Sequence, residues 1–245
     1  TLPIDFAPLV LHLTFLPRAG EPELTLLVSS SDLKLVVYQR SRETGLFEEV
    51  KDAVLPSVVS SPVMSIDTTT TQDRNYHVAL GMKDGNVRLY TFSPTNPTPA
   101  EYTYHIDGPI SCVQLSSPTS SSGSSDAASL RLLVASLAGF ACIYTLGAGG
   151  KRKNDVIVPS VLTSGKTPVL CIYGAPFSCE GGFAIFVGDV AGNVRVYDEG
   201  HRLLFERCFS APIHRVAVGD VDGDGQKEVV VLSKTRIHVL RRSNN

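Results

Sequence analysis

A 13-residue pattern that occurs twice constrains the fold of this chain more than any other feature. It reads VALGMKDGNVRLY at Val78–Tyr90 and IFVGDVAGNVRVY at Ile185–Tyr197. Each copy has an apolar run, a short turn containing Gly, and a second run in which apolar and polar residues alternate. Strict alternation beside a Gly-containing turn is typical of a β-hairpin with one buried face. Two near-copies indicate that the chain is built from repeats.

Further copies of the hairpin pattern occur at a regular spacing. They end at Tyr38, Tyr90, Tyr144 and Tyr197, which are 52, 54 and 53 residues apart, and a shorter copy ends at Leu240, 43 residues after Tyr197. A short apolar run opened by Pro precedes each copy, at Pro8, Pro62, Pro109, Pro168 and Pro212. Pro is admissible at the first position of a strand, because that residue need not donate to the ladder. We therefore expect an opening strand and a hairpin in each of five units.

Most units also carry a candidate for a fourth strand after the hairpin. These candidates are Leu46–Val50, Glu101–Ile106, Asp155–Val158 and Leu203–Phe209. Four short strands per unit of about 45 to 55 residues are typical of a β-propeller blade. A β-sandwich would also give evenly spaced short strands, but it does not explain two markers that recur together five times. The sequence thus predicts an all-β fold, a single β-propeller domain with five four-stranded blades at residues 1–55, 56–106, 107–160, 161–210 and 211–245.

Composition narrows the possible classes of partner. The chain has 22 Lys and Arg against 24 Asp and Glu, which gives a net charge of −2 and no electrostatic reason to expect nucleic acid. No apolar run approaches the roughly 18 residues that span a bilayer, and nothing resembles a signal peptide. The five cysteines include no CxxC pair, which favours reduced thiols and a cytoplasmic protein. Because the first residue is Thr1, we expect this chain to be part of a longer one.

One loop carries recognisable chemistry, in the segment GDVDGDGQKEVVVL of the last unit. Asp220, Asp222 and Asp224 alternate with glycines, and Glu228 follows. Carboxylates at alternate positions of a tight loop converge on a hard cation, with Ca²⁺ ahead of Mg²⁺ because the ligands are nearly all protein oxygens. The pattern resembles the FG-GAP loop of integrin-type propeller blades. In this interpretation Asp220, Asp222, Asp224 and Glu228 are the metal ligands.

A second interpretation of the same loop needs no metal. Asp and Gly are also the residues that a hairpin turn selects, through Asx-turns and left-handed backbone conformations. The matching turn of the preceding unit keeps Asp189 but has Ala191 and Asn193 where further carboxylates would stand. Only one unit therefore has a complete acidic set, and both interpretations stay open.

No residue pattern indicates catalysis. The six histidines form no HxH or HExxH pair, no Ser lies in a GxSxG elbow, and the phosphate-loop and dinucleotide fingerprints are absent. His12 and His214 occupy similar positions in their opening strands, where we expect polar residues facing the water of a central channel. The chain has no Trp, the aromatic platform usual for sugars and single strands.

In its succession of segments the chain resembles the kaptin family of FG-GAP-like propeller proteins, which are associated with actin and with the KICSTOR complex. The resemblance rests on LLVSSSDLKLVVY with GLFEEV, on DGPISCV, on LLVAS, and on LLFERCFSAPI leading into GDVDGDGQKEVVVLS and RIHVL. These segments occur in the same order over nearly the whole chain, although no single motif is diagnostic. The resemblance implies a seven-bladed propeller, of which the five units here would form the C-terminal part.

The resemblance also implies a function. A kaptin-like protein is a non-catalytic scaffold for other protein subunits, such as another propeller protein in a TOR-regulating KICSTOR-type assembly, or actin. It would be cytoplasmic and associated with the lysosome or the cytoskeleton. Two alternatives stay open from the residues alone: a propeller that binds a small ligand or catalyses a reaction at its channel mouth, and an extracellular integrin-like adhesion propeller.

Overall fold

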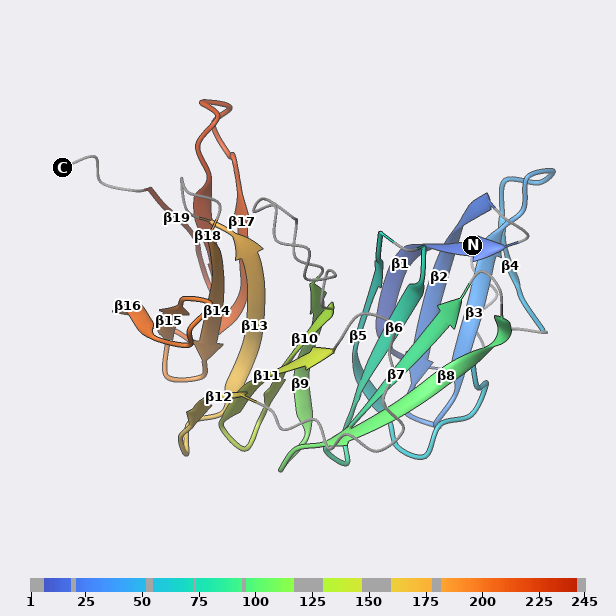
Figure 1. Cartoon of the computed structure of the whole chain (residues 1–245), viewed down its shortest axis with the longest axis horizontal. Coiled ribbons are helices and arrows are strands. Elements are labelled where there is room, and N and C mark those ends of the chain that lie inside the picture. Colours follow the sequence, from blue (N-terminus) through green and yellow to red (C-terminus); the bar gives the residue numbers. More distant parts are fainter. Residues whose placement is uncertain are drawn as a thin grey trace. The chain divides into compact units, whose positions relative to one another are not determined.

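A computed structural model describes residues 7–18, 21–51, 55–72, 74–93, 96–116, 130–146, 160–177 and 182–241. The described part consists of β-strands joined by turns, and the strands pair antiparallel in five sheets (Figure 1). The chain divides into two compact units, Thr1–Leu115 and Ser116–Asn245. Each is described below by itself. No helix long and apolar enough to cross a membrane occurs in the described ranges.

In the first unit, two four-stranded sheets follow one another along the chain. The first sheet contains β1 (Pro8–Arg18), β2 (Glu21–Ser30), β3 (Leu35–Arg40) and β4 (Phe47–Glu49), in that spatial order. The second sheet contains β5 (Val63–Thr70), β6 (Tyr76–Met82), β7 (Asn86–Ser93) and β8 (Asn96–His105), also in sequence order. Up-and-down order is the blade topology that the repeats predict.

The other three sheets complete the described strands. One sheet has the order β12-β11-β10-β9 and contains β9 (Ile110–Ser116), β10 (Leu130–Ser136), β11 (Phe140–Leu146) and β12 (Ser160–Ser164). The next contains β13 (Val169–Pro176), β14 (Phe183–Asp189), β15 (Asn193–Tyr197) and β16 (Leu203–Cys208). The last contains β17 (Ile213–Gly219), β18 (Glu228–Ser233) and β19 (Ile237–Leu240).

These strands confirm the all-β prediction, and they correct two details of it. The last sheet has three described strands, not four. In the third sequence repeat, the predicted fourth strand at Asp155–Val158 lies outside the described residues. The strand that pairs with β11 is Ser160–Ser164. Both differences concern the outermost strand of a sheet, where exposure to solvent weakens the apolar alternation by which strands are predicted.

In three of the five sequence repeats, a hydrogen bond joins the two markers. The residue that opens the hairpin turn donates its backbone N–H to the carbonyl of the Pro that precedes the opening strand. The three bonds are Lys83 to Pro62 at 2.9 Å, Val190 to Pro168 at 3.0 Å and Lys234 to Pro212 at 3.1 Å. A Pro that cannot donate can still accept, so it stands directly before the strand and holds the turn at the same time.

Within each of the two compact units, sheets pack face to face on an apolar core. In the first unit Leu27, Leu35 and Val37 of the first sheet belong to one buried cluster with Val78 and Leu80 of the second. In the second unit Phe186 and Val196 share a buried cluster with Val216 and Val231 of the last sheet. The members of one cluster occupy alternate positions of a strand, because successive side chains point to opposite faces, and β6 and β14 are buried on both faces.

Candidate functional sites

The acidic loop joins β17 to β18. Gly219 ends β17 and Glu228 begins β18, so Asp220, Asp222 and Asp224 lie on the connection between two paired strands. The backbone is left-handed at Gly223 (φ 79°) and Gly225 (φ 84°), a conformation that Gly adopts without the strain of a Cβ. The loop therefore curls so that alternate side chains reach the same side.

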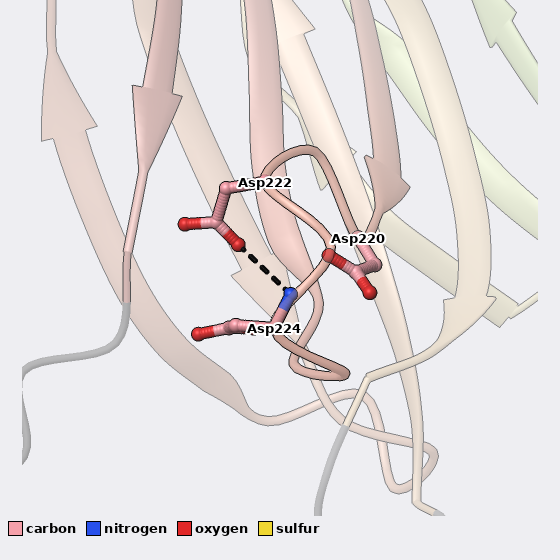
Figure 2. A group of neighbouring side chains, drawn as sticks. All are labelled: Asp220, Asp222 and Asp224. Atoms are coloured by element: carbon pink, nitrogen blue, oxygen red, sulfur yellow. Dashed lines mark hydrogen bonds between the residues drawn. The ribbon is translucent and has the colours of Figure 1, made fainter.

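The three aspartates of the loop converge as the sequence predicted (Figure 2). One carboxylate oxygen of each of Asp220, Asp222 and Asp224 lies within 4.8 Å of the other two, and all three residues are exposed. Oxygens that bind one Ca²⁺ at 2.3–2.6 Å lie up to about 5 Å apart, so this spacing fits three ligands of a single ion. The three ligand atoms are thus of the kind that Ca²⁺ prefers, and they lie at a suitable spacing for it.

The same carboxylates also accept backbone hydrogen bonds within the loop. Asp220 accepts from the N–H of Gly223 through Oδ1 at 2.6 Å and from the N–H of Gly225 through Oδ2 at 2.9 Å. Asp222 accepts from Asp224 at 3.3 Å, the bond drawn in Figure 2, and Asp224 accepts from Gln226 at 2.7 Å. These are Asx-type bonds of the kind that the metal-free interpretation requires. A carboxylate oxygen has two lone pairs, so such bonds leave it able to bind a cation.

Glu228, the fourth predicted ligand, lies outside the aspartate group. Its side chain is buried, at 3% exposure, and its Oε2 accepts the N–H of Val221 at 2.8 Å. Arg241 follows the end of β19 and contacts the group instead, with its Nη2 2.7 Å from Asp222 Oδ2. The structure thus gathers three carboxylates and one guanidinium, and it uses Glu228 to hold the start of the loop.

The two histidines predicted to face channel water have different surroundings. His12 is half-buried on β1, with its Nε2 3.1 Å from Thr68 Oγ1, and Thr68 Oγ1 also lies 2.7 Å from Thr14 Oγ1. His214 is exposed on β17. Because His12 packs against β5 of the neighbouring sheet, it serves a contact between sheets.

Of the four cysteines that the structure describes, three are buried and one is exposed. Cys112, Cys142 and Cys171 are buried and free, whereas the free Cys208 is exposed on β16. Burial raises the pKa of the Cys142 thiol to about 12. Cys179 lies outside the described residues. These thiols act as small apolar groups in their strands.

The exposed apolar segment of β16 is a surface feature that sequence reasoning missed. Every residue of β16 is exposed, and the consecutive Leu203, Leu204 and Phe205 are 52%, 60% and 48% exposed. The segment was predicted as a strand, but its exposure is not evident from hydropathy, because buried and exposed apolar strands contain the same residues. Exposed apolar side chains gathered in one place mark interaction surfaces more often than scattered ones do.

Comparison with known proteins gives one family over the whole chain. The family model described as "KICSTOR complex protein kaptin" matches residues 1–245. The curated mouse (Mus musculus) protein of that name is 25% identical over 258 residues, covering 99% of this chain. The chain spans 60% of the length of that relative.

Solved structures at low identity support the fold. The crystal structure of BBS1N in complex with ARL6DN, from a crystal soaked with mercury, aligns at a TM-score of 0.61 and 14% identity, covering 100% of this chain and 69% of that one. The β-propeller domain of Cps50 (Swd1) from Myceliophteria thermophila aligns at a TM-score of 0.57 and 12% identity, covering 90% and 62%. Together with the antiparallel sheets, this likeness confirms the β-propeller fold.

Proposed function

Because this chain belongs to the kaptin family, we propose that it forms part of a non-catalytic β-propeller scaffold that binds other protein subunits in a KICSTOR-type assembly. The mouse relative bears the name of a KICSTOR complex protein, and the match extends along the whole chain. A scaffold of this kind acts by presenting a rigid surface, and repeated sheets that pack on apolar cores supply that rigidity. The assembly would place the protein in the cytoplasm.

The exposed apolar residues of β16 are the observation that carries the proposal. Leu203, Leu204 and Phe205 occupy three consecutive positions of an edge strand, so they present apolar area on both faces of the sheet margin. Glu206 and Arg207 follow them, and both are exposed. An apolar centre beside charged residues is the usual composition of a protein–protein interface. We take this strand as a contact surface for a partner subunit.

The acidic loop would hold a structural Ca²⁺ in the same proposal. The spacing of the Asp220, Asp222 and Asp224 oxygens supports a single hard cation. Such an ion would offset the repulsion of three neighbouring carboxylates and would tie β17 to β18 at the end of their sheet. Its role would be to stiffen the scaffold.

The proposal is tested by purifying the tagged full-length protein from cells of its source. The unmodified protein should bring down a fixed set of subunits in stoichiometric amounts. The variant Phe205→Asp with Leu204→Asp should lose at least one of them, because a charge buried in an apolar contact is costly. Val161→Asp is the matched control, since Val161 is also an exposed apolar residue, at 52%, on the outer strand β12. Recovery of the unmodified protein without subunits would overturn the proposal.

A further inference from the structure

One face of the opening strand of the first sheet is apolar and exposed. Leu11, Leu13 and Phe15 occupy alternate positions of β1 and are 57%, 59% and 60% exposed. They point away from the second sheet, because His12, which lies between the two leucines, contacts Thr68 of β5. We call these three residues the β1 face.

The place of Leu11 is buried in three later sheets. The opening strands of four sheets share a register shift near their start, after which Leu11 occupies the same place as Ile66, Ile172 and Val216. Those three residues are only 7%, 2% and 1% exposed. Ile66 belongs to the core that the second sheet shares with the first, and Val216 to the core that the last sheet shares with the fourth. This place is therefore where a blade packs on the blade before it.

The second and third strands of the first sheet continue the β1 face. Val28 lies opposite Leu11 in the register and forms a small buried cluster with Leu26 and Tyr38. Leu80, the equivalent of Val28 in the second sheet, belongs to the core that the first two sheets share. The first sheet thus carries one half of an apolar core of the kind that joins two blades.

A small residue marks the surface that receives the following blade. The next-to-last residue of the second strand is small in the first four sheets: Ser29, Gly81, Ala135 and Gly188. A Cβ on Gly81 would lie 2.5 Å from Cγ2 of Ile110, which begins the next sheet. A Cβ on Gly188 would lie 2.6 Å from Cγ2 of Ile213, the corresponding residue of the last sheet. The following strand packs too closely for a larger side chain at this place.

The last sheet has a large residue at that place. Leu232 is the next-to-last residue of β18, lies opposite Arg215 in the register and is 41% exposed. Its side chain would collide with the opening strand of a blade packed as closely as Ile110 and Ile213 are packed. The β1 face therefore needs a neighbour other than the last sheet.

From these observations we propose that the β1 face docks a further blade of the same protein, from a segment outside residues 1–245. The next-to-last residue of the second strand of that blade is Gly, Ser or Ala, since β1 packs closely against it. The occupant belongs to the same protein because the places equivalent to Leu11 in the second and last sheets pack on a blade of this chain. The length of the mouse relative leaves room for such a segment, because the chain spans 60% of it. This contact lies within one chain, so it does not depend on a bound subunit.

Photo-crosslinking in the full-length protein tests this contact. The photoreactive residue p-benzoylphenylalanine replaces Leu11, and the protein is purified without its partners before irradiation. We expect mass spectrometry to find a crosslink within the chain to a segment outside residues 1–245. Val161, an exposed apolar residue of the outer strand β12, is the matched control and should not crosslink to that segment. Crosslinks confined to residues 1–245, above all to β17, β18 or β19, would overturn the proposal, and so would crosslinks to another protein alone.

Thiol labelling gives a second readout of the same contact. Leu11→Cys and Val161→Cys are compared in the full-length protein with Cys208→Ser, which removes an exposed thiol, and mass spectrometry locates the label. In the native protein purified without partners, Leu11→Cys should react about tenfold more slowly than Val161→Cys, because a blade covers it. Equal rates would overturn the proposal. Protection of Leu11→Cys only when subunits are bound would assign the β1 face to a partner and refute it. Protection without any recovered subunit would refute the scaffold function and leave this contact intact.

Discussion

Asp189 and Arg195 form an ion pair across the turn that joins β14 to β15, with Arg195 Nη1 3.1 Å from Asp189 Oδ2. Asp189 is 1% exposed, and its Oδ1 also accepts the backbone N–H of Asn193 at 2.9 Å. Arg195 extends the network to Glu206 on β16, at 2.7 Å. The carboxylate therefore holds the turn, the third strand and the fourth strand together.

Removing that carboxylate should destabilise the second unit. We expect Asp189→Ala to lower the free energy of unfolding by about 2–4 kcal/mol, because the turn loses its acceptor and the half-buried Arg195 loses a partner. The measurement is urea denaturation of the variant. Asp84→Ala is the control: Asp84 caps Asn86 in the equivalent hairpin but is exposed, so its loss should cost no more than about 1 kcal/mol. Equal effects would contradict the assigned role of burial.

Two glycines with the same backbone conformation should respond differently to Ala. Gly192 has φ 92°, and a Cβ there would lie 2.2 Å from the carbonyl oxygen of Phe209; Gly223 has φ 79° with nothing within 4 Å. Gly223→Ala should cost about 1–2 kcal/mol for the left-handed conformation alone. Gly192→Ala should cost clearly more, because the backbone at Phe209, directly after β16, must also move. Thermal melting of both variants checks the order, and a smaller loss for Gly192→Ala would contradict it.

Stability should fall at alkaline pH. Burial raises the pKa of the Cys142 thiol from 9.0 to about 12, and burial raises the pKa of Tyr104 from 10.0 to about 12. Between these values the unfolded chain has lost protons that the folded chain keeps, so each group stabilises the fold fully below its unfolded pKa and loses this effect as pH rises toward 12. Denaturation at a series of pH values measures the slope. Cys142→Ala should make it shallower, and an unchanged slope would exclude this thiol as a source.

Thiol reagents should distinguish Cys208 from the buried cysteines. In native protein at pH 8, Cys208 should react fast, whereas Cys112, Cys142 and Cys171 should react only on unfolding, because burial blocks access and the Cys142 thiolate is disfavoured. The variant Cys179→Ser removes the remaining cysteine from the count, and mass spectrometry locates the label. Rapid labelling of Cys142 in this variant would contradict the placement of β11.

Calcium should raise the melting temperature if the acidic loop binds it. The expected result is a higher melting temperature in 1 mM Ca²⁺ than in EDTA, because an ion bound to the folded state stabilises it by mass action. Asp222→Asn with Asp224→Asn should abolish the difference. An identical melting curve in both conditions would leave the Asx-type bonds of Asp220 as the reason for the acidic sequence.

Much of the fold follows from the sequence because turn chemistry and apolar alternation occur together. Asn86 and Asn193 occupy the same place in both copies of the hairpin, and each bonds an aspartate of its turn. Arg88 and Arg195 likewise occupy one place and pair with Glu101 and Glu206 on the fourth strand. The same residue type makes the same contact at equivalent positions of both copies, so the repeat can be recognised in the sequence.

Features that depend on the surroundings could not be predicted. Glu228 was expected as a metal ligand beside the aspartates, but the start of β18 turns its side chain inward to accept the N–H of Val221. Leu204 and Phe205 have the composition of core residues and are exposed, because no described strand covers that edge. Whether other elements cover an outer strand depends on the neighbouring sheets. The residues of the strand itself do not determine it. The seven-bladed size implied by the family resemblance stays a prediction.

The size of the native protein in a gentle lysate of its own cells tests the scaffold function most directly. Size-exclusion chromatography, with antibody detection of the endogenous protein, compares its elution with that of the purified chain. A family member that works as a KICSTOR-type subunit should elute almost entirely in a larger complex, together with a fixed set of proteins, and the complex should persist through a second column. Elution of the bulk of the protein at the size of a free monomer would contradict the account.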